Sequence, residues 1–150
     1  MTHTHYKLLF HLVWSTKGRL PFISPFVKDR LYAYIRAPVT DQDGSILAMN
    51  GMPDHIHILV SLTPKASLPD LIRRIKTETS KWLRREIPLC QTFAWQEGYG
   101  AFTVGHANKE AVIKYIQLQE EHHHHTSYDK EYLNLLNLQK ISFDPRFVLG

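Results

Sequence analysis

The sequence has little cysteine and no long hydrophobic run. Cys90 is the one cysteine among 150 residues, which excludes a disulfide within the chain and fits a reducing compartment. No segment approaches the roughly 20 apolar residues of a membrane-spanning helix, and the first residues lack the pattern of a signal peptide. We therefore expect a cytoplasmic protein that does not enter a membrane.

Acidic residues are also scarce relative to basic ones. The chain carries 18 Lys and Arg against 14 Asp and Glu, which makes the formal net charge +4, and its isoelectric point is near 9.2. Such a balance permits binding of a polyanion but does not require it. With 43% hydrophobic residues a chain of this length can build one sizeable core, so we expect one domain over residues 1–150.

The periodicity of the apolar residues predicts both strands and helices. A period of two from Tyr6 to Trp14 and from His55 to Leu62 is typical of strands, and a spacing of three and four after Ser67 is typical of a helix. This pattern favours an α+β fold, in which an antiparallel sheet has helices packed mainly on one face, similar to ferredoxin-like domains. The expected elements are a strand at 6–14, a helix at 25–35, a loop at 38–44, strands at 45–50 and 55–62 joined by a turn at 51–54, a helix at 67–86, one or two short strands within 92–104, a helix at 109–124 capped by Asn108, and a helix at 129–138.

The segment 53–60 contains the most informative local pattern. His55 and His57 are two residues apart on an expected strand, so their side chains share one face, about 6–7 Å apart along the strand axis. Two neutral imidazoles at this spacing can converge on one metal ion. An isolated His-x-His is more often a pair of polar residues on a solvent-facing strand, so this pattern alone leaves both interpretations open.

A second pattern lies on the helix expected at 109–124. Tyr115 and Gln119 are one turn apart, on the same stripe as Val112 and Ile116, which makes this the buried side of the helix. Tyr115 alone is explained by a core tyrosine whose hydroxyl reaches the rim. Gln119 is harder to explain in that way, because a buried amide needs hydrogen-bond partners. The stripe can therefore place a phenol and a carbonyl oxygen in one site.

These residue types together fit the cleavage of a phosphodiester by a tyrosine nucleophile. A divalent cation held by two imidazoles and a carbonyl oxygen offsets the charge of the phosphate and keeps positions open for it. Mixed nitrogen and oxygen ligands suit Mg²⁺ or Mn²⁺. A phosphotyrosine ester preserves the energy of the broken bond, so a 3′-OH can later reverse the step and join strands.

Five motifs, in order along the chain, resemble the single-tyrosine HUH transposases of the smallest bacterial insertion sequences. This IS200-like family includes the REP-associated tyrosine transposases. The letters HUH stand for histidine, hydrophobe, histidine, here His55-Ile56-His57. The motifs are FHLVWSTK at 10–17, MPDHIH at 52–57, WQEGYGAF at 95–102, YIQLQ at 115–119, and two histidines and Thr126 followed by the helix with Glu131-Tyr132-x-x-Leu135-Leu136.

The resemblance implies the HUH endonuclease/transposase fold and a DNA transposase that acts on single-stranded DNA. Tyr115 would be the nucleophile, giving a 5′-phosphotyrosine intermediate and a free 3′-OH before the strands are rejoined. His55, His57 and Gln119 would be the ligands of Mg²⁺ or Mn²⁺. The substrates would be single-stranded element ends folded as imperfect hairpins. The protein would form a homodimer, in which Tyr115 acts either with the histidine pair of its own subunit or with that of its neighbour.

Basic and aromatic residues outside these motifs have two interpretations each. The cations are either phosphate contacts for DNA or a solvated surface: Lys17, Arg19, Arg73, Arg74, Lys76 and Lys81. The aromatic residues either stack on unpaired bases or belong to the core, which is the commoner role: Trp95, Tyr99 and Phe102.

Three further features near the predicted site are open. The tract His122 to His125 extends the stripe of Tyr115, so one of its members could approach the metal, or the tract is a solvated helix end. Asp54 either orients an imidazole or shapes the turn. His11 either supports a ligand or is simply packed.

Three other functions are consistent with parts of the pattern. The first is a domesticated protein that binds hairpin or REP DNA and no longer mobilises an element. The second is a replication initiator or relaxase, which shares the histidine pair but usually carries additional domains. The third is a plain metal-binding α+β domain.

Overall fold

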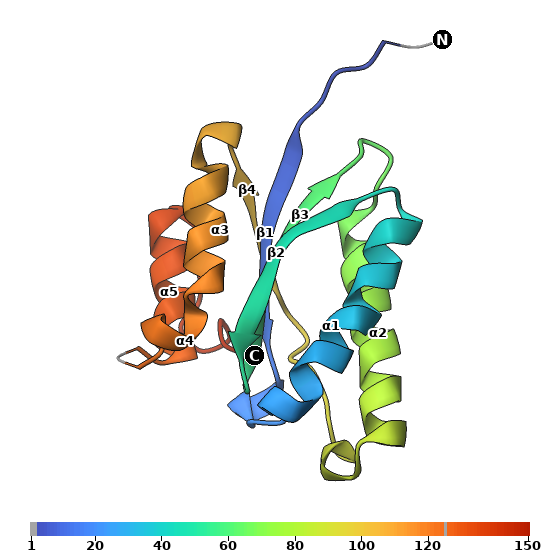
Figure 1. The fold of residues 1–150 in the computed structure, drawn as a ribbon. Coiled ribbons are helices and arrows are strands. Elements are labelled where there is room, and N and C mark those ends of the chain that lie inside the picture. The colour runs from blue at the N-terminus through green and yellow to red at the C-terminus, as the bar shows by residue number, and fades with distance from the viewer. Residues whose placement is uncertain (1–2, 125) are drawn as a thin grey trace.

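The computed structural model describes residues 3–124 and 126–150. Its centre is a four-stranded antiparallel sheet with the order β2-β3-β1-β4, which places β1 and β3 in the middle. Figure 1 shows this sheet between two groups of helices. The strands are β1 (Leu8–Ser15), β2 (Ser45–Met52), β3 (His55–Leu62) and β4 (Gly100–Val104).

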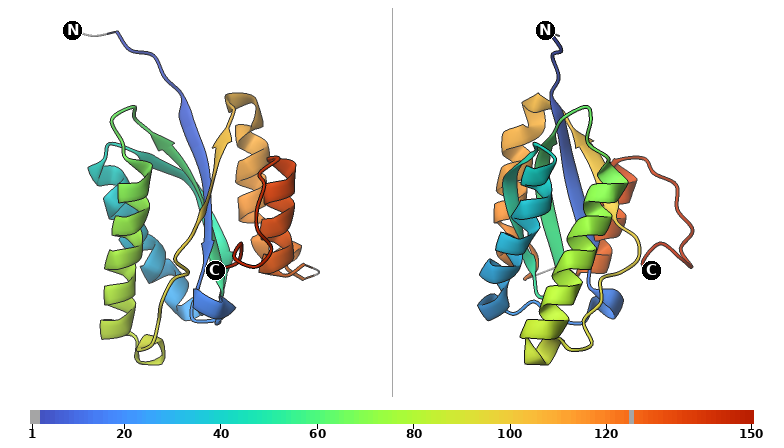
Figure 2. Two further views of the ribbon diagram at one scale, coloured as in Figure 1. Left: turned by 180° about the vertical axis from the view of Figure 1, so that it is seen from behind. Right: turned by 90° about the vertical axis from the view of Figure 1, so that its right-hand side faces the viewer.

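The helices form one layer on each side of the sheet (Figures 1 and 2). The first layer consists of α1 (Pro25–Asp41) and α2 (Leu68–Glu86). The second consists of α3 (Lys109–Gln117), α4 (Gln119–His122) and α5 (Tyr128–Leu138). Short 3₁₀ turns lie at Lys17–Arg19, Pro88–Cys90 and His106–Asn108. Within the described residues, none of the helices is long and apolar enough to span a bilayer.

The alternation expected for the two central strands is confirmed. Ile56, Ile58 and Val60 of β3 belong to the apolar cluster shared with α1 and α2. Leu59 belongs to the cluster on the opposite face, together with Ile116 of α3. Because successive strand residues point to opposite faces, His55 and His57 emerge on the side that α3, α4 and α5 cover.

The predicted α+β class with an antiparallel sheet is confirmed, and the placement of the helices adds a difference. Helices cover both faces of the sheet, whereas the sequence pattern predicts them mainly on one. The second face is apolar as well, because Leu9 and Val13 of β1 and Phe102 of β4 are buried there at 3%, 0% and 4% exposure. Leaving this surface in water would be unfavourable, and the second layer of helices buries it.

The first helix and the second strand are longer than expected. α1 continues through Pro38 to Asp41, where the sequence predicts a loop, and β2 continues to Met52. Val39 is fully buried in the same cluster as Leu31 and Ile35, so packing in the last turn outweighs the cost of a proline there. Ser67 caps α2, with its hydroxyl accepting from the amide of Asp70.

The helix expected at 109–124 is interrupted. Asn108 makes no capping hydrogen bond through its side chain, and Leu118, at φ −96° and ψ 23°, separates α3 from α4. The side-chain amide of Asn50 on β2 donates to the carbonyl oxygens of Ile116 and Gln117 at 3.0 and 3.1 Å. A tertiary contact therefore satisfies carbonyls at the end of α3, and the chain can turn before Gln119.

At Gly51 the backbones of β2 and β3 approach closely next to the histidines. It lies opposite Ile56, and a Cβ at this position would be 2.1 Å from the carbonyl oxygen of His55 and 2.9 Å from the Cα of Ile56. Because both are backbone atoms, they cannot move aside without shifting the strand. We expect Gly51→Ala to lower the free energy of unfolding by about 2 kcal/mol, measured by urea denaturation.

Gly105→Ala is the matched control for this prediction. A Cβ at Gly105 would meet nothing within 4 Å, and its φ of −69° is accessible to alanine. This variant should be as stable as the wild type or slightly more stable. Equal unfolding free energies for the two variants would contradict the close pairing at Gly51.

Candidate active site

The histidine pair of β3 lies in the interior between the sheet and the second helix layer. His55 and His57 are exposed by only 1% and 0%, and their ring centroids are 5.2 Å apart. Residues this polar need partners when they are buried. The solvent-facing interpretation of the pair is therefore excluded by the fold.

Tyr115 of α3 and Gln119 of α4 reach the histidine pair of their own chain. The Oε1 atom of Gln119 lies 3.0 Å from Nε2 of His55, and the Tyr115 ring lies 5.7 Å from the His57 ring. The four residues that the sequence analysis singled out for catalysis and metal binding thus share one site. Their roles stay predictions, because proximity alone assigns no function.

Glu131 of α5 lies at the centre of this site, whereas the sequence analysis names it only as part of the fifth motif and gives it no role. Its Oε1 atom is 2.9 Å from Nε2 of His57 and 3.5 Å from Nε2 of His55. Its Oε2 atom accepts hydrogen bonds from the hydroxyl of Tyr115 and, at 3.1 Å, from Nε2 of Gln119. A signal was available, because Glu131 precedes Tyr132 and stands one turn before Leu135, on the apolar stripe of its helix.

His123 completes the cluster. Its Nε2 atom is 3.0 Å from both Gln119 Oε1 and Glu131 Oε1. The sequence analysis left open that one histidine of the tract approaches the site, and the structure identifies it as His123. His122 is further away, with Nε2 at 3.5 Å from Glu131 Oε2. His124 is exposed, and His125 lies outside the described residues.

Glu131 and Tyr115 are buried side by side, one as an ionised carboxylate and the other as a neutral hydroxyl. Burial disfavours the charged form of Glu131, but hydrogen bonds from His123 and His57 outweigh it and hold the pKa of Glu131 well below its ordinary range. Burial, together with the charge of Glu131, raises the pKa of Tyr115 well above its ordinary range. Tyr115 is thus a neutral hydroxyl that donates to an ionised carboxylate. Burial also lowers the pKa of His57.

The donor set fits a divalent metal ion. Ligand atoms of His55, His57, His123 and Glu131 all lie within 4.8 Å of one another. The distances from Glu131 Oε1 to the three Nε2 atoms are 2.9 to 3.5 Å, whereas ligands of a tetrahedral ion at ordinary bond lengths are about 3.4 Å apart. Gln119 Oε1 borders the same space, so the predicted third ligand is also within reach. The four residues form a possible metal-binding site.

The second ring nitrogen of each strand histidine is held by a polar partner. Nδ1 of His55 lies 2.7 Å from Oδ1 of Asp54, and Nδ1 of His57 lies 2.8 Å from Nε2 of His11. Such partners fix the ring orientation and leave Nε2 directed at the cluster. Asp54 therefore has the orienting contact that was one of its two interpretations, and His11 supports His57 rather than being simply packed.

The cations proposed to contact DNA are divided between the two faces. Arg19 borders the site, with its Nε 2.8 Å from Asp129 and its Nη1 3.0 Å from the hydroxyl of Ser15, whereas Lys17 is an exposed residue of the same 3₁₀ turn. The other four lie on α2, which packs on the opposite face of the sheet, so the fold does not bring them to the histidines: Arg73, Arg74, Lys76 and Lys81. DNA binding by all six stays a prediction.

Two of the three aromatic residues that could have stacked on bases belong to the core. Trp95 and Phe102 are exposed by only 7% and 4%, and Nε1 of Trp95 donates to the hydroxyl of Thr79. Tyr99 is exposed by 36%. Trp95 and Phe102 are therefore core residues, which is the commoner of their two interpretations.

Comparisons with known proteins agree on one family. Residues 4–119 match the sequence profile of the family described as "Transposase IS200 like". The ISDra2 transposase TnpA of Deinococcus radiodurans is 28% identical over 121 residues, which cover 77% of this chain and 86% of that protein.

Solved structures share the fold. A transposase candidate from Deinococcus radiodurans R1 superposes with a TM-score of 0.62 at 27% identity, over 79% of this chain and 98% of that one. A REP-associated tyrosine transposase bound to a REP hairpin superposes with a TM-score of 0.64 at 15% identity, over 82% of this chain and 74% of that one.

The contact between His11 and His57 predicts a role for His11 in metal affinity. His11→Leu removes the partner of His57 Nδ1 and should weaken Mn²⁺ binding by about 10- to 100-fold, measured by calorimetry. His11→Gln should bind within a few-fold of the wild type, because its amide carbonyl can accept from that nitrogen. His124→Ala controls for adventitious binding by the histidine tract. Equal affinity in the Leu and Gln variants would contradict the role.

The burial of His11 also predicts acid lability of the metal-free protein. Burial, and then the neighbouring His57, lowers the pKa of His11 from 6.5 to about 3. Between these values the unfolded chain gains a proton that the folded protein does not bind, so stability falls as pH falls from about 6.5 to about 3. The contribution is at most about 1.4 kcal/mol per pH unit.

His11→Gln isolates this contribution, because it removes the titrating group and keeps a hydrogen-bonding side chain. Urea denaturation in EDTA at pH 7, 6 and 5 should show a shallower loss of stability for the variant than for the wild type. Parallel curves for the two proteins would contradict the prediction.

Proposed function

Because the chain belongs to the family of IS200-like transposases, we propose that it cuts and rejoins single-stranded DNA with Tyr115 as the nucleophile. The observation that carries this proposal is the contact of the Tyr115 hydroxyl with Glu131, inside a buried cluster of metal-ligand side chains. Tyr115, His55, His57 and Gln119 all fall within residues 4–119, the part that matches the family. We also propose that residues 1–150 act as one catalytic domain.

The proposed reaction is a reversible exchange of ester bonds. The Tyr115 oxygen attacks the phosphorus, the bond to the 3′ oxygen breaks, and the products are a 5′-phosphotyrosine and a free 3′-OH. Glu131 Oε2 accepts the hydrogen bond of the Tyr115 hydroxyl and so orients the phenolic oxygen, and the proton that the phenol loses is balanced by the one that the leaving 3′ oxygen gains. In the reverse direction a 3′-OH attacks the phosphotyrosine, the tyrosine leaves, and the strand is joined without another energy source.

We propose His55, His57 and Gln119 as the ligands of Mg²⁺ or Mn²⁺, with His123 and Glu131 as further donors of the same cluster. When bound, such a cation offsets the negative charge of the phosphate and of the tyrosinate. Asp54 and His11 hold the two imidazoles in the orientation that this binding needs. Three imidazoles and one carboxylate favour Mn²⁺ over Mg²⁺, because nitrogen ligands suit Mg²⁺ poorly.

The proposed substrate is a single-stranded element end that folds as a hairpin. Support comes from the resemblance of the sequence motifs and from the similar fold of a REP-associated tyrosine transposase bound to a REP hairpin. The mechanism uses the tyrosine and the histidines of one chain, and the homodimer stays a prediction. The cytoplasm is the proposed location, since the lone buried Cys90 fits a reducing compartment.

A second candidate function is favoured by the same structural neighbour. In this alternative the protein is a domesticated descendant that recognises hairpin or REP DNA and mobilises no element. It predicts tight, hairpin-selective binding without covalent chemistry, so the adduct separates the two functions.

Tyr115→Phe tests the nucleophile directly. Labelled hairpin oligonucleotides from the flanks of the gene are incubated with Mn²⁺ or Mg²⁺ and analysed on denaturing gels. The wild type should retain label on the protein, and EDTA or the variant should abolish it. The affinity of the variant for the same DNA should stay within a few-fold, because the ring remains and only the hydroxyl is lost.

Tyr34→Phe is the matched control, because Tyr34 is 42% exposed on α1, across the sheet from the site. It should form the adduct as the wild type does. An adduct in Tyr115→Phe would exclude Tyr115 as the nucleophile, and binding without an adduct in the wild type would favour the domesticated function.

A further inference from the structure

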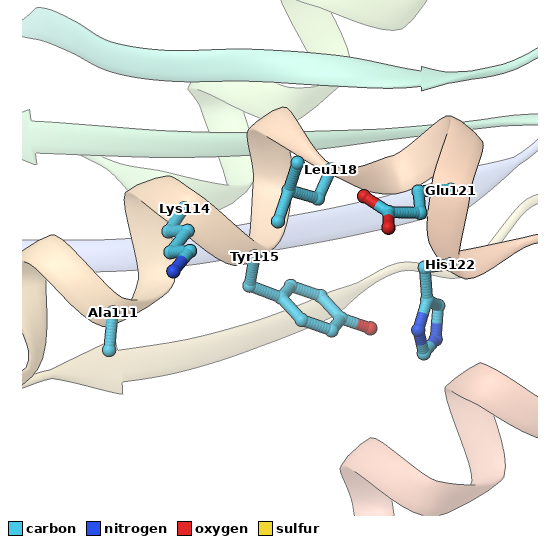
Figure 3. A pocket seen from close by; sticks show the side chains of 6 residues that line it. All are labelled: Ala111, Lys114, Tyr115, Leu118, Glu121 and His122. Atoms are coloured by element: carbon cyan, nitrogen blue, oxygen red, sulfur yellow. The ribbon is translucent and has the colours of Figure 1, made fainter.

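A hollow of about 450 Å³ opens beside Tyr115 on the outer side of α3 and α4. Its size is in the range of pockets that hold small organic ligands. Figure 3 shows the ring of Tyr115 extending into it, with the phenolic oxygen pointing towards His122. The six side chains that line it come from α3, α4 and the break between them: Ala111, Lys114, Tyr115, Leu118, Glu121 and His122.

The walls of this hollow combine flat aromatic and apolar surface. Leu118 is 43% exposed although it is a large apolar residue, and its side chain lies over the Tyr115 ring in Figure 3. The ring centroids of Tyr115 and His122 are 5.4 Å apart at an angle of 60°. Aromatic rings beside apolar side chains are the surfaces on which unpaired nucleobases stack.

Two opposite charges flank the Tyr115 ring in the same hollow. Figure 3 places Lys114 on one side of the ring and Glu121 on the other. Among the residues that the structure describes, neither side chain has a hydrogen bond or ion pair with another residue. Both charges are therefore available to a ligand that offers a hydrogen-bond donor and a negative charge.

The inner edge of the hollow adjoins the proposed reaction centre. The Tyr115 hydroxyl and Gln119 Nε2 donate to Glu131 Oε2, and Nε2 of His122 lies 3.5 Å from the same oxygen. In the proposed reaction the Tyr115 oxygen bonds to the phosphorus, so the phosphate must lie against this hydroxyl, at the inner edge of the hollow. The nucleotide attached to that phosphate then lies in the hollow.

In-line displacement decides which nucleotide this is. The leaving 3′ oxygen departs on the side of the phosphorus opposite the Tyr115 oxygen, whereas the 5′ oxygen stays beside the new bond. The geometry points to the hollow as the subsite for the nucleotide downstream of the cut, the one that remains joined to Tyr115 through its 5′-phosphate. This inference rests on the proposed function and adds the position and preference of one nucleotide.

The charges of the hollow predict which base it takes. The Glu121 carboxylate can only accept hydrogen bonds, and adenine, cytosine and guanine each offer it an exocyclic amino group. Thymine has no amino group, and its one donor, the imide N3–H, lies between two carbonyl oxygens that the carboxylate repels. Lys114 suits the next phosphate of the strand, a contact that is independent of the base. The subsite therefore selects an amino-bearing base and disfavours thymine.

The first test identifies the nucleotide attached to Tyr115. Hairpin oligonucleotides with randomised single-stranded arms are incubated with the protein and Mn²⁺. The adducts are digested with nuclease and protease, and the nucleotide on the Tyr115 peptide is identified by mass spectrometry. Thymidylate should be depleted about tenfold in the wild type and less than twofold in Glu121→Ala. Lys114→Met should lower the yield with every base by a similar factor, roughly threefold.

Glu110→Ala is the matched control, because Glu110 is an exposed acid of α3 outside the hollow. It should keep the thymidylate depletion of the wild type. Adducts without a base preference, or a preference that survives in Glu121→Ala, would overturn the subsite while leaving Tyr115 as the nucleophile. Absence of any wild-type adduct would instead count against the proposed function.

A second measurement tests the subsite without any chemistry. The four deoxynucleoside 5′-monophosphates are titrated into Tyr115→Phe, which keeps the ring and lacks the nucleophile, and the methyl NMR signals of Ala111 and Leu118 are followed. These signals should shift with dAMP, dCMP and dGMP, and dTMP should bind most weakly. Shifts confined to other parts of the protein, or equal binding of dTMP, would overturn the proposal even if no adduct forms.

Discussion

The carboxylate of Glu131 is ionised and only 2% exposed, and the arrangement of the second helix layer depends on it. A buried charge is strongly unfavourable unless paired groups and hydrogen bonds compensate it. Here the compensation comes from β3 through His57, from α3 through Tyr115, and from the end of α4 through His123. Removing any one partner leaves the others around an undercompensated charge, so these elements hold one another in place.

One face of the sheet packs against the main apolar core and the other carries the candidate site, and the same strands contribute side chains to both faces. The face under α1 and α2 carries the large apolar cluster, including the fully buried Trp14 of β1. The other face is apolar around Val13 and Phe102, and it also carries the buried polar side chains of the site, which are hydrogen-bonded to one another. The separation explains why the cations of α2 are remote from the histidines, although they are the densest basic stretch of the chain.

The parts of the fold and of the site that depend on local periodicity could be predicted from the sequence. The period of two on β3 separates Ile56 and Ile58 from His55 and His57, and the helical spacing sets Tyr115 and Gln119 on one side. The positions of Glu131 and His123 in the site do not follow from this periodicity. They reach the site because the chain breaks at Leu118 and α5 returns across the sheet. Both are tertiary features, and the break follows the contact of Asn50 with the end of α3.

The central claim is that one buried cluster holds a divalent metal next to the hydroxyl of Tyr115. The most direct test is anomalous diffraction at the manganese edge from crystals of the protein grown with Mn²⁺. The account predicts a peak about 2.0–2.3 Å from Nε2 of both His55 and His57, with an oxygen of Gln119 or Glu131 as a further ligand. A peak at His124 alone, with the His55 and His57 pair bound to no metal, would contradict it.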